Sequence, residues 1–119
     1  MATAVKRKLS DSTDGTGILV VATATAGTDL HTAVAGQVAG TFDEVWLWAV
    51  NTHTEDVDLT IEYGGVTSPK DVIKVSIPFD SGLVLVCPGL ILQNGIDVAA
   101  FASVASKVSI FGFINAITD

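Results

Sequence analysis

The sequence predicts an all-β protein: a single-domain antiparallel β-sandwich of about eight strands, jelly-roll-like in arrangement. Three observations support this prediction. Apolar residues lack the sustained i, i+3, i+4 spacing of an amphipathic helix and occur instead in short runs rich in β-branched residues. Gly, Asn, Asp and Pro interrupt these runs repeatedly. The chain has 119 residues, enough for one core of ordinary size and too few for a second.

The candidate strands follow one another closely along the chain. Their ranges are 17–25, 28–33, 44–51, 57–63, 72–77, 83–87, 96–102 and 108–116.

The connections between these strands contain typical turn residues. Asn94-Gly95 is the clearest turn, because both residue types tolerate the positive φ that tight turns require. The small, flexible segment 34–40 predicts a loop that crosses from one sheet to the other. An early crossover followed by tight turns favours a jelly roll. An immunoglobulin sandwich usually has a Cys, Trp, Cys framework, and this sequence lacks one.

Two candidate strands are apolar on both sides. Strand 57–63 alternates apolar and polar residues, as a half-exposed strand does, whereas 44–51 and 108–116 do not. Because a two-layer sandwich buries only the inner face of each sheet, these strands need a second apolar neighbour. We predict that the neighbour is another copy of the chain; long loops or the N-terminal segment of the same subunit are the alternatives. The interface candidates are Trp46, Trp48, Phe111 and Phe113.

Charge is segregated along the chain. The formal net charge is -7, yet Lys6, Arg7 and Lys8 supply half of the six basic residues. We therefore predict a flexible basic N-terminal arm over residues 1–16 and a β-sandwich domain over 17–119. The three arm residues are candidates for binding an acidic partner, with simple solvation of a terminal tail as the alternative. The acidic body disfavours direct binding to nucleic acid or to an anionic membrane.

The sequence predicts a soluble chain made in the cytoplasm. Polar residues follow Lys8 where a signal peptide would be apolar, and the longest uncharged apolar run, 82–92, is shorter than the roughly twenty residues of a membrane-spanning helix. Cys87, the one cysteine, cannot form an internal disulfide.

No residue pattern predicts catalysis, a cofactor or a metal site. A nucleophile elbow is absent, and Cys87 follows an apolar run that predicts a buried, inert thiol. His31 and His53 stand alone, and two imidazoles do not make a zinc site. The acidic segment 55–58 lacks the Gly and distal Glu of a calcium loop, which indicates a solvated turn. We therefore predict that the protein is not an enzyme.

Several segments, taken together, resemble a known family. They are LSDSTDG at 9–15, DEVWLWAVN at 43–51, LTIEYGG at 59–65, LVLVCPGL at 83–90 and IFGFIN at 110–115. These segments resemble small virion structural proteins of tailed bacteriophages, of the head decoration or cement kind, over about residues 9 to 115.

The resemblance implies a non-catalytic β-sandwich subunit that is made in the host cytoplasm and assembles as a trimer or similar ring on the capsid surface. Its partners would be copies of itself and the major capsid protein or another virion protein. The same features also suit a head-to-tail connector, a tail or fibre-base subunit, or a trimeric carbohydrate- or receptor-binding jelly roll. A lectin of that last kind would carry aromatic residues on loops, whereas Trp46 and Trp48 lie in the middle of a candidate strand.

Overall fold

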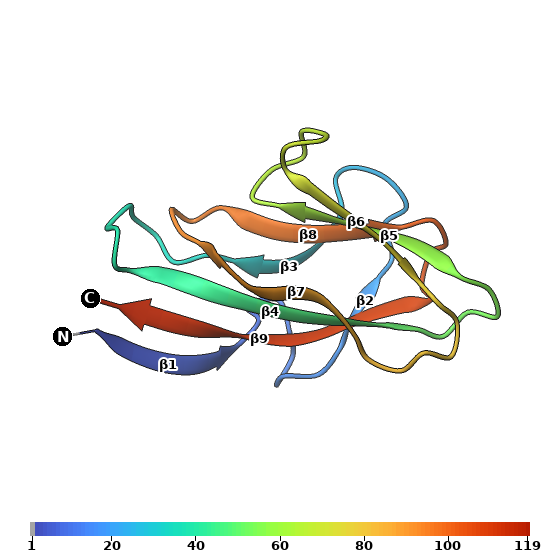
Figure 1. Cartoon of the computed structure of the whole chain (residues 1–119), viewed down its shortest axis with the longest axis horizontal. Coiled ribbons are helices and arrows are strands. Elements are labelled where there is room, and N and C mark those ends of the chain that lie inside the picture. Colours follow the sequence, from blue (N-terminus) through green and yellow to red (C-terminus); the bar gives the residue numbers. More distant parts are fainter. Residues whose placement is uncertain (1) are drawn as a thin grey trace.

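The computed structural model describes residues 2–119, which form nine strands and no helix (Figure 1). In chain order the strands are β1 (Thr3–Lys8), β2 (Ile18–Val20), β3 (Thr28–Thr32), β4 (Phe42–Asn51), β5 (Val57–Tyr63), β6 (Val72–Ile77), β7 (Val84–Leu92), β8 (Asp97–Ala102) and β9 (Val108–Thr118). The predicted all-β class is confirmed.

The strands form two antiparallel sheets. A five-stranded sheet has the order β1-β9-β4-β7, with β2 also paired to β9, and a four-stranded sheet has the order β3-β8-β5-β6. Without β1, the two sheets read β2-β9-β4-β7 and β3-β8-β5-β6, so the chain crosses repeatedly between the layers. This is the jelly-roll arrangement that the sequence predicted, with β1 added at one edge.

The core lies between the two sheets. Alternate residues of β4 point inward, and Val45, Leu47 and Ala49 are completely buried there. Leu59 and Ile61 of β5 meet them from the opposite sheet and are also completely buried. Each fully buried Val, Leu or Ile contributes about 1.5–3 kcal/mol to the stability of the fold.

Two of the predicted strands differ clearly in extent from the observed ones. Only Ile18–Val20 of the predicted 17–25 strand is regular, because the amides of Val21 and Ala22 donate to the Thr28 hydroxyl instead of to a neighbouring strand. Strand β7 runs to Leu92, through Pro88 and Gly89, whereas the predicted strand ended at Cys87. Two irregularities in the β4–β7 register absorb this interruption of the ladder.

The turns and the long loop are largely as predicted. Asn94 and Gly95 both have positive φ, 69° and 66°, which confirms the tight turn. This turn joins β7 to β8 and therefore connects the two sheets instead of closing a hairpin within one. Segment 34–40 links β3 to β4 and crosses between the sheets, as expected.

Part of the predicted flexible arm over residues 1–16 is a strand in the structure. Thr3–Lys8 forms β1, which pairs with β9 from Thr3 opposite Thr118 to Lys8 opposite Phe113. Leu9, the next residue, is 1% exposed and belongs to the core. The arm became a strand because β9 extends past the end of β2 and offers a free edge there. Met1 lies outside the described residues.

Candidate assembly interface on the five-stranded sheet

Four aromatic side chains lie on the outer face of the five-stranded sheet. Residues directly opposite each other on antiparallel strands share a face. Trp46 of β4 lies opposite Phe113 of β9, and Trp48 lies opposite Phe111. Their neighbours along β4 point into the core, so these four point outward. The structure thus brings together all four residues that the sequence suggested as interface candidates.

Three of the four rings form a near-parallel group. Trp46 and Phe113 have centroids 6.2 Å apart with planes 15° from parallel, and Trp48 and Phe113 have centroids 5.9 Å apart. Offset parallel pairs of this kind are favourable beyond their burial of apolar area. The stacked rings therefore support one another, and together with Phe111 they are called here the aromatic face.

Polar and backbone contacts fix the orientation of Trp46. Its indole Nε1 donates to Glu44 Oε1 at 2.7 Å, and Asn115 Nδ2 donates to the same oxygen at 3.1 Å. These two hydrogen bonds stabilise the carboxylate and lower the pKa of Glu44. The indole also lies over Gly89 of β7, where an added Cβ would stand 2.7 Å from Trp46 Cζ2. Only a residue without a side chain fits beneath this ring.

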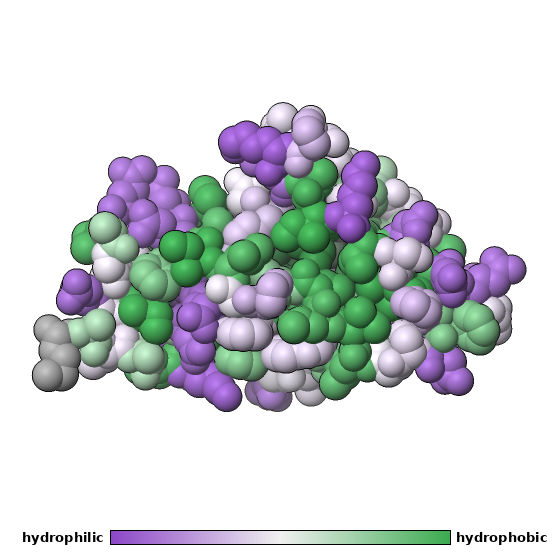
Figure 2. Space-filling model, viewed as in Figure 1, coloured by the Kyte–Doolittle hydropathy of each residue, from purple (hydrophilic) through white to green (hydrophobic). Residues whose placement is uncertain are grey.

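Exposed aliphatic side chains extend the aromatic face across the sheet. Leu19 of β2 lies opposite Ser109, Leu85 of β7 lies opposite Trp48, and Ile91 lies opposite Glu44. Leu85 is 47% exposed and Ile91 is 59% exposed. Figure 2 shows apolar residues gathered in the middle of the view, where Figure 1 places β7 across β4 and β9. A broad apolar surface of this kind typically marks a protein interaction site.

Strand β1, which carries three basic residues, borders the aromatic face. Lys6 Nζ lies 4.4 Å from the centroid of the Phe113 ring, a cation–π contact. Lys8 Nζ donates to the carbonyl of Ser12 at 2.9 Å. Arg7 is opposite Ile114, an inward-facing residue, and therefore points to the other side of the strand. From sequence, the basic N-terminal arm and the interface candidates were two separate predictions, whereas in the structure they are neighbours.

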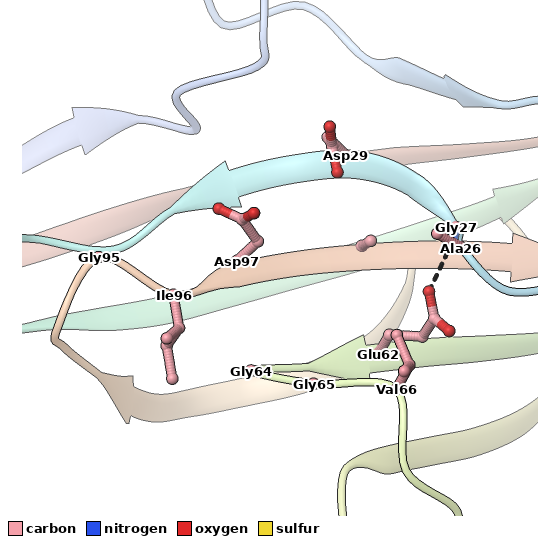
Figure 3. A pocket seen from close by; sticks show the side chains of 11 residues that line it. Ala26, Gly27, Asp29, Glu62, Gly64, Gly65, Val66, Gly95, Ile96 and Asp97 are labelled. Carbon is pink, nitrogen blue, oxygen red and sulfur yellow. Dashed lines mark hydrogen bonds between the residues drawn. The ribbon is translucent and has the colours of Figure 1, made fainter.

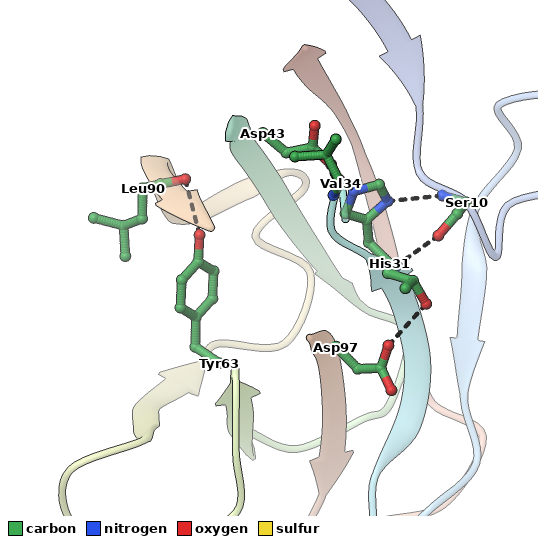
Figure 4. Close-up of polar contacts among 8 residues, drawn as sticks. Ser10, His31, Val34, Asp43, Tyr63, Leu90 and Asp97 are labelled. Atoms are coloured by element: carbon green, nitrogen blue, oxygen red, sulfur yellow. Dashed lines mark hydrogen bonds and ion pairs between the residues drawn. The ribbon is translucent and has the colours of Figure 1, made fainter. Parts of the chain in front are cut away.

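A buried polar cluster links β3 and β4 to the segment after β1 (Figure 4). The Ser10 amide donates to His31 Nδ1 at 3.0 Å, so the ring proton is on Nε2, which donates to Asp43 Oδ2 at 2.7 Å. The Val34 amide also donates to Asp43 Oδ2, at 3.1 Å. No sequence pattern predicted this cluster, because His31 and Asp43 belong to different sheets. Every hydrogen bond in it ties one segment of the fold to another.

A cavity of about 390 Å³ lies on the outside of the four-stranded sheet (Figure 3). Its most buried acidic residue is Glu62, which is 2% exposed. Both carboxylate oxygens of Glu62 are already used, since they accept hydrogen bonds from the Gly27 amide at 2.6 Å and the Thr25 hydroxyl at 2.8 Å. This carboxylate holds the loop before β3 in place instead of facing a substrate.

The remaining residues considered from sequence lie apart from one another. Cys87 is completely buried and its thiol donates to the carbonyl of Val45 at 3.3 Å, which confirms the prediction of a buried thiol. Burial raises the pKa of this thiol. His53 lies in the turn after β4, with its amide bonded to Asn51 Oδ1. Within residues 2–119, no group of three His, Cys, Asp or Glu side chains is placed to hold a metal ion.

Comparison with known proteins gives no assigned relative. No protein-family model, curated protein sequence or solved structure matches this chain significantly. Within residues 2–119, no helix is long and apolar enough to cross a membrane.

Proposed function

We propose that this chain is a non-enzymatic structural subunit of a bacteriophage virion: a decoration or cement protein that assembles as a homotrimer on the head and stabilises it. The observation that carries the assembly role is the aromatic face. Trp46, Trp48 and Phe113 are only half buried within one subunit, although they stand at the centre of an apolar sheet surface. The sequence resemblance to phage decoration proteins supports the virion setting.

The proposed role is mechanical. Removing apolar surface from water contributes about 25 cal/mol per Å², so a subunit that covers its aromatic face on assembly gains stability in proportion to the area covered. Many copies bridging neighbouring capsid subunits add small free energies, and together these resist the internal pressure of packed DNA. No reactive side chain is needed for this role.

Light scattering on the purified chain tests the assembly step. We expect a particle of three times the subunit mass of 12.3 kDa. The chain has two tryptophans, both on the aromatic face, so their emission should shift to longer wavelength when dilution separates the subunits. A monomer at every micromolar concentration would remove the argument for additional buried surface.

Virions lacking the protein test the virion role. We expect stripped heads to break at lower temperature than complete ones, and added purified protein to restore their stability. Stripped virions that are as stable as complete ones, yet fail to join tails or to adsorb to cells, would replace decoration with a connector or receptor-binding role.

A carbohydrate-binding module is the second candidate function. The observation that favours it is the near-parallel ring group beside the polar side chains of Glu44 and Asn115, since aromatic rings stack on the apolar faces of sugars. A carbohydrate array separates the two functions. Selective binding that is lost in Trp46→Ala would favour the second, whereas a subunit in a trimer would bind no glycan through this face.

A further inference from the structure

Strand β1 presents a free edge. It is the outermost strand of the five-stranded sheet, and within residues 2–119 no strand pairs with its outer side. All six of its residues are exposed. Because alternate residues of a paired strand direct their N–H and C=O groups away from the partner, β1 carries a row of backbone donors and acceptors toward solvent.

The edge is protected by charge alone. Strand edges are commonly blocked by proline, by a bulge or by a covering loop. β1 contains no proline, and its register with β9 is unbroken from Thr3 to Lys8. It carries Lys6, Arg7 and Lys8, and the same three cations on the β1 of a second copy would repel it. This edge therefore disfavours pairing with its own counterpart.

The same cations favour a strand of opposite charge. Lys6 and Arg7 point to opposite sides of β1, so acidic residues on both faces of an added strand would find a partner. The other edges of this chain do not supply such a strand. β2, β6 and β7 contain no acidic residue, and β3 contains one, Asp29.

We propose that the free edge of β1 binds an acidic, extended segment of another protein as an added β-strand. In this mode, main-chain hydrogen bonds supply affinity and alternate side chains supply selectivity. Because β1 is already an ordered strand, its edge can pair with the added segment without a prior folding step of the N-terminal residues. The proposal does not depend on the proposed virion role, because the edge and its charge are features of the isolated subunit.

Titration of isotope-labelled protein with a capped peptide about eight residues long, with consecutive glutamates at its centre and threonines at both ends, tests the proposal. Consecutive glutamates place carboxylates on both faces of the added strand, where they can pair with Lys6, Arg7 and Lys8. We expect chemical-shift changes centred on β1 and slower hydrogen exchange at alternate β1 amides. Binding should weaken as salt is added, because the cations are exposed. The same peptide with lysine in place of glutamate should not bind.

Two triple variants with the same change in net charge provide the matched control. The chain has three basic residues in β1 and three elsewhere, Lys70, Lys74 and Lys107. K6E/R7E/K8E should bind the acidic peptide about tenfold more weakly, the effect of losing three exposed ion pairs, whereas K70E/K74E/K107E should bind as the parent does. If K6E/R7E/K8E separates β1 from β9, the milder K6Q/R7Q/K8Q variant replaces it in this test.

Three results would overturn the proposal. The acidic peptide could fail to bind, or both triple variants could lose binding equally. The peptide and a single-stranded DNA oligonucleotide could also bind equally well without slowing exchange at β1, which would show general attraction of polyanions instead of strand addition.

Discussion

Lys6 Nζ in β1 lies 4.4 Å from the centroid of the Phe113 ring in β9, so the basic strand and the aromatic face form one continuous surface. The contact joins the first strand to the last. Phe113 in turn stacks against both tryptophans, so Lys6 contacts the same ring that joins them. A charge at this place marks the border between the edge of the sheet and its apolar face.

The cation–π contact should be measurable in the stability of the fold. We expect Lys6→Ala to lower the free energy of unfolding by about 0.5–1 kcal/mol, the size of such a contact at an exposed site. Lys74→Ala, which removes an exposed lysine from β6, should have little effect. Urea denaturation of both variants at one protein concentration provides the measurement. Equal midpoints for the two variants would show that the Lys6 contact contributes nothing.

A charge on the aromatic face should separate the subunits without unfolding them. Phe111 is 39% exposed, so Phe111→Asp places a carboxylate on the face at little cost to the core. Burying that carboxylate between subunits without a partner is strongly unfavourable, and we expect the proposed trimer to become a monomer with an unchanged circular dichroism spectrum. Phe79→Asp is the control, because Phe79 is 55% exposed in the segment between β6 and β7. Identical oligomeric states in both variants would argue against this face as the interface.

Much of the fold could be predicted from local sequence. Period-two alternation identified β5 and β6 at their observed bounds, and turn residues placed the connections around them. These signals are local, because the alternation of apolar and polar residues within one strand shows which of its sides faces the core.

The rest of the fold and the site depend on pairings between distant segments. All six residues of β1 are exposed, so no alternation marks it as a strand. The four aromatic residues could be chosen from sequence because their strands are apolar on both sides. Their positions opposite one another, however, depend on the β4–β9 register. The position of Lys6 over Phe113 and the hydrogen bond between His31 and Asp43 likewise follow from the topology.

Gly89 should be required beneath the indole of Trp46. Gly89 and Gly82 both have positive φ, 76° and 69°, but an added Cβ meets Trp46 only at Gly89 and has open space at Gly82. Gly82→Ala should therefore show only the backbone strain, and Gly89→Ala should cost about 1–3 kcal/mol more because the ring must move. Chemical denaturation gives both values, and tryptophan emission reports the ring. Equal costs would mean that the ring adapts freely.

The Asp43 carboxylate should stabilise the fold through the groups that donate to it. Asp43→Leu removes the acceptor for His31 Nε2 and for the Val34 amide. An unsatisfied buried donor costs about 1–3 kcal/mol. Asp43→Asn keeps an oxygen acceptor of similar shape, so we expect it to be clearly more stable than Asp43→Leu in thermal and urea unfolding. If both variants lose the same stability, the hydrogen bonds are not the source of the effect.

Tyr63, the one tyrosine of the chain, should make stability fall at alkaline pH. Its hydroxyl donates to the carbonyl of Leu90 at 2.8 Å, and burial, more than the nearby charges, raises its pKa well above the ordinary value of 10.0. Below that ordinary value both the folded and the unfolded chain hold the proton, and pH has no effect through this group. Above it, the unfolded chain loses the proton while the folded chain keeps it, so rising pH favours unfolding.

We expect the free energy of unfolding to decrease between about pH 9 and about pH 11, on either side of the ordinary tyrosine pKa. Urea denaturation at both pH values measures the decrease, and absorbance of the phenolate should appear only as the chain unfolds. Tyr63→Phe loses the hydrogen bond at both pH values and removes the titrating group, so its decrease should be smaller than that of the parent. Phenolate absorbance from the folded protein near pH 10 would contradict the raised pKa.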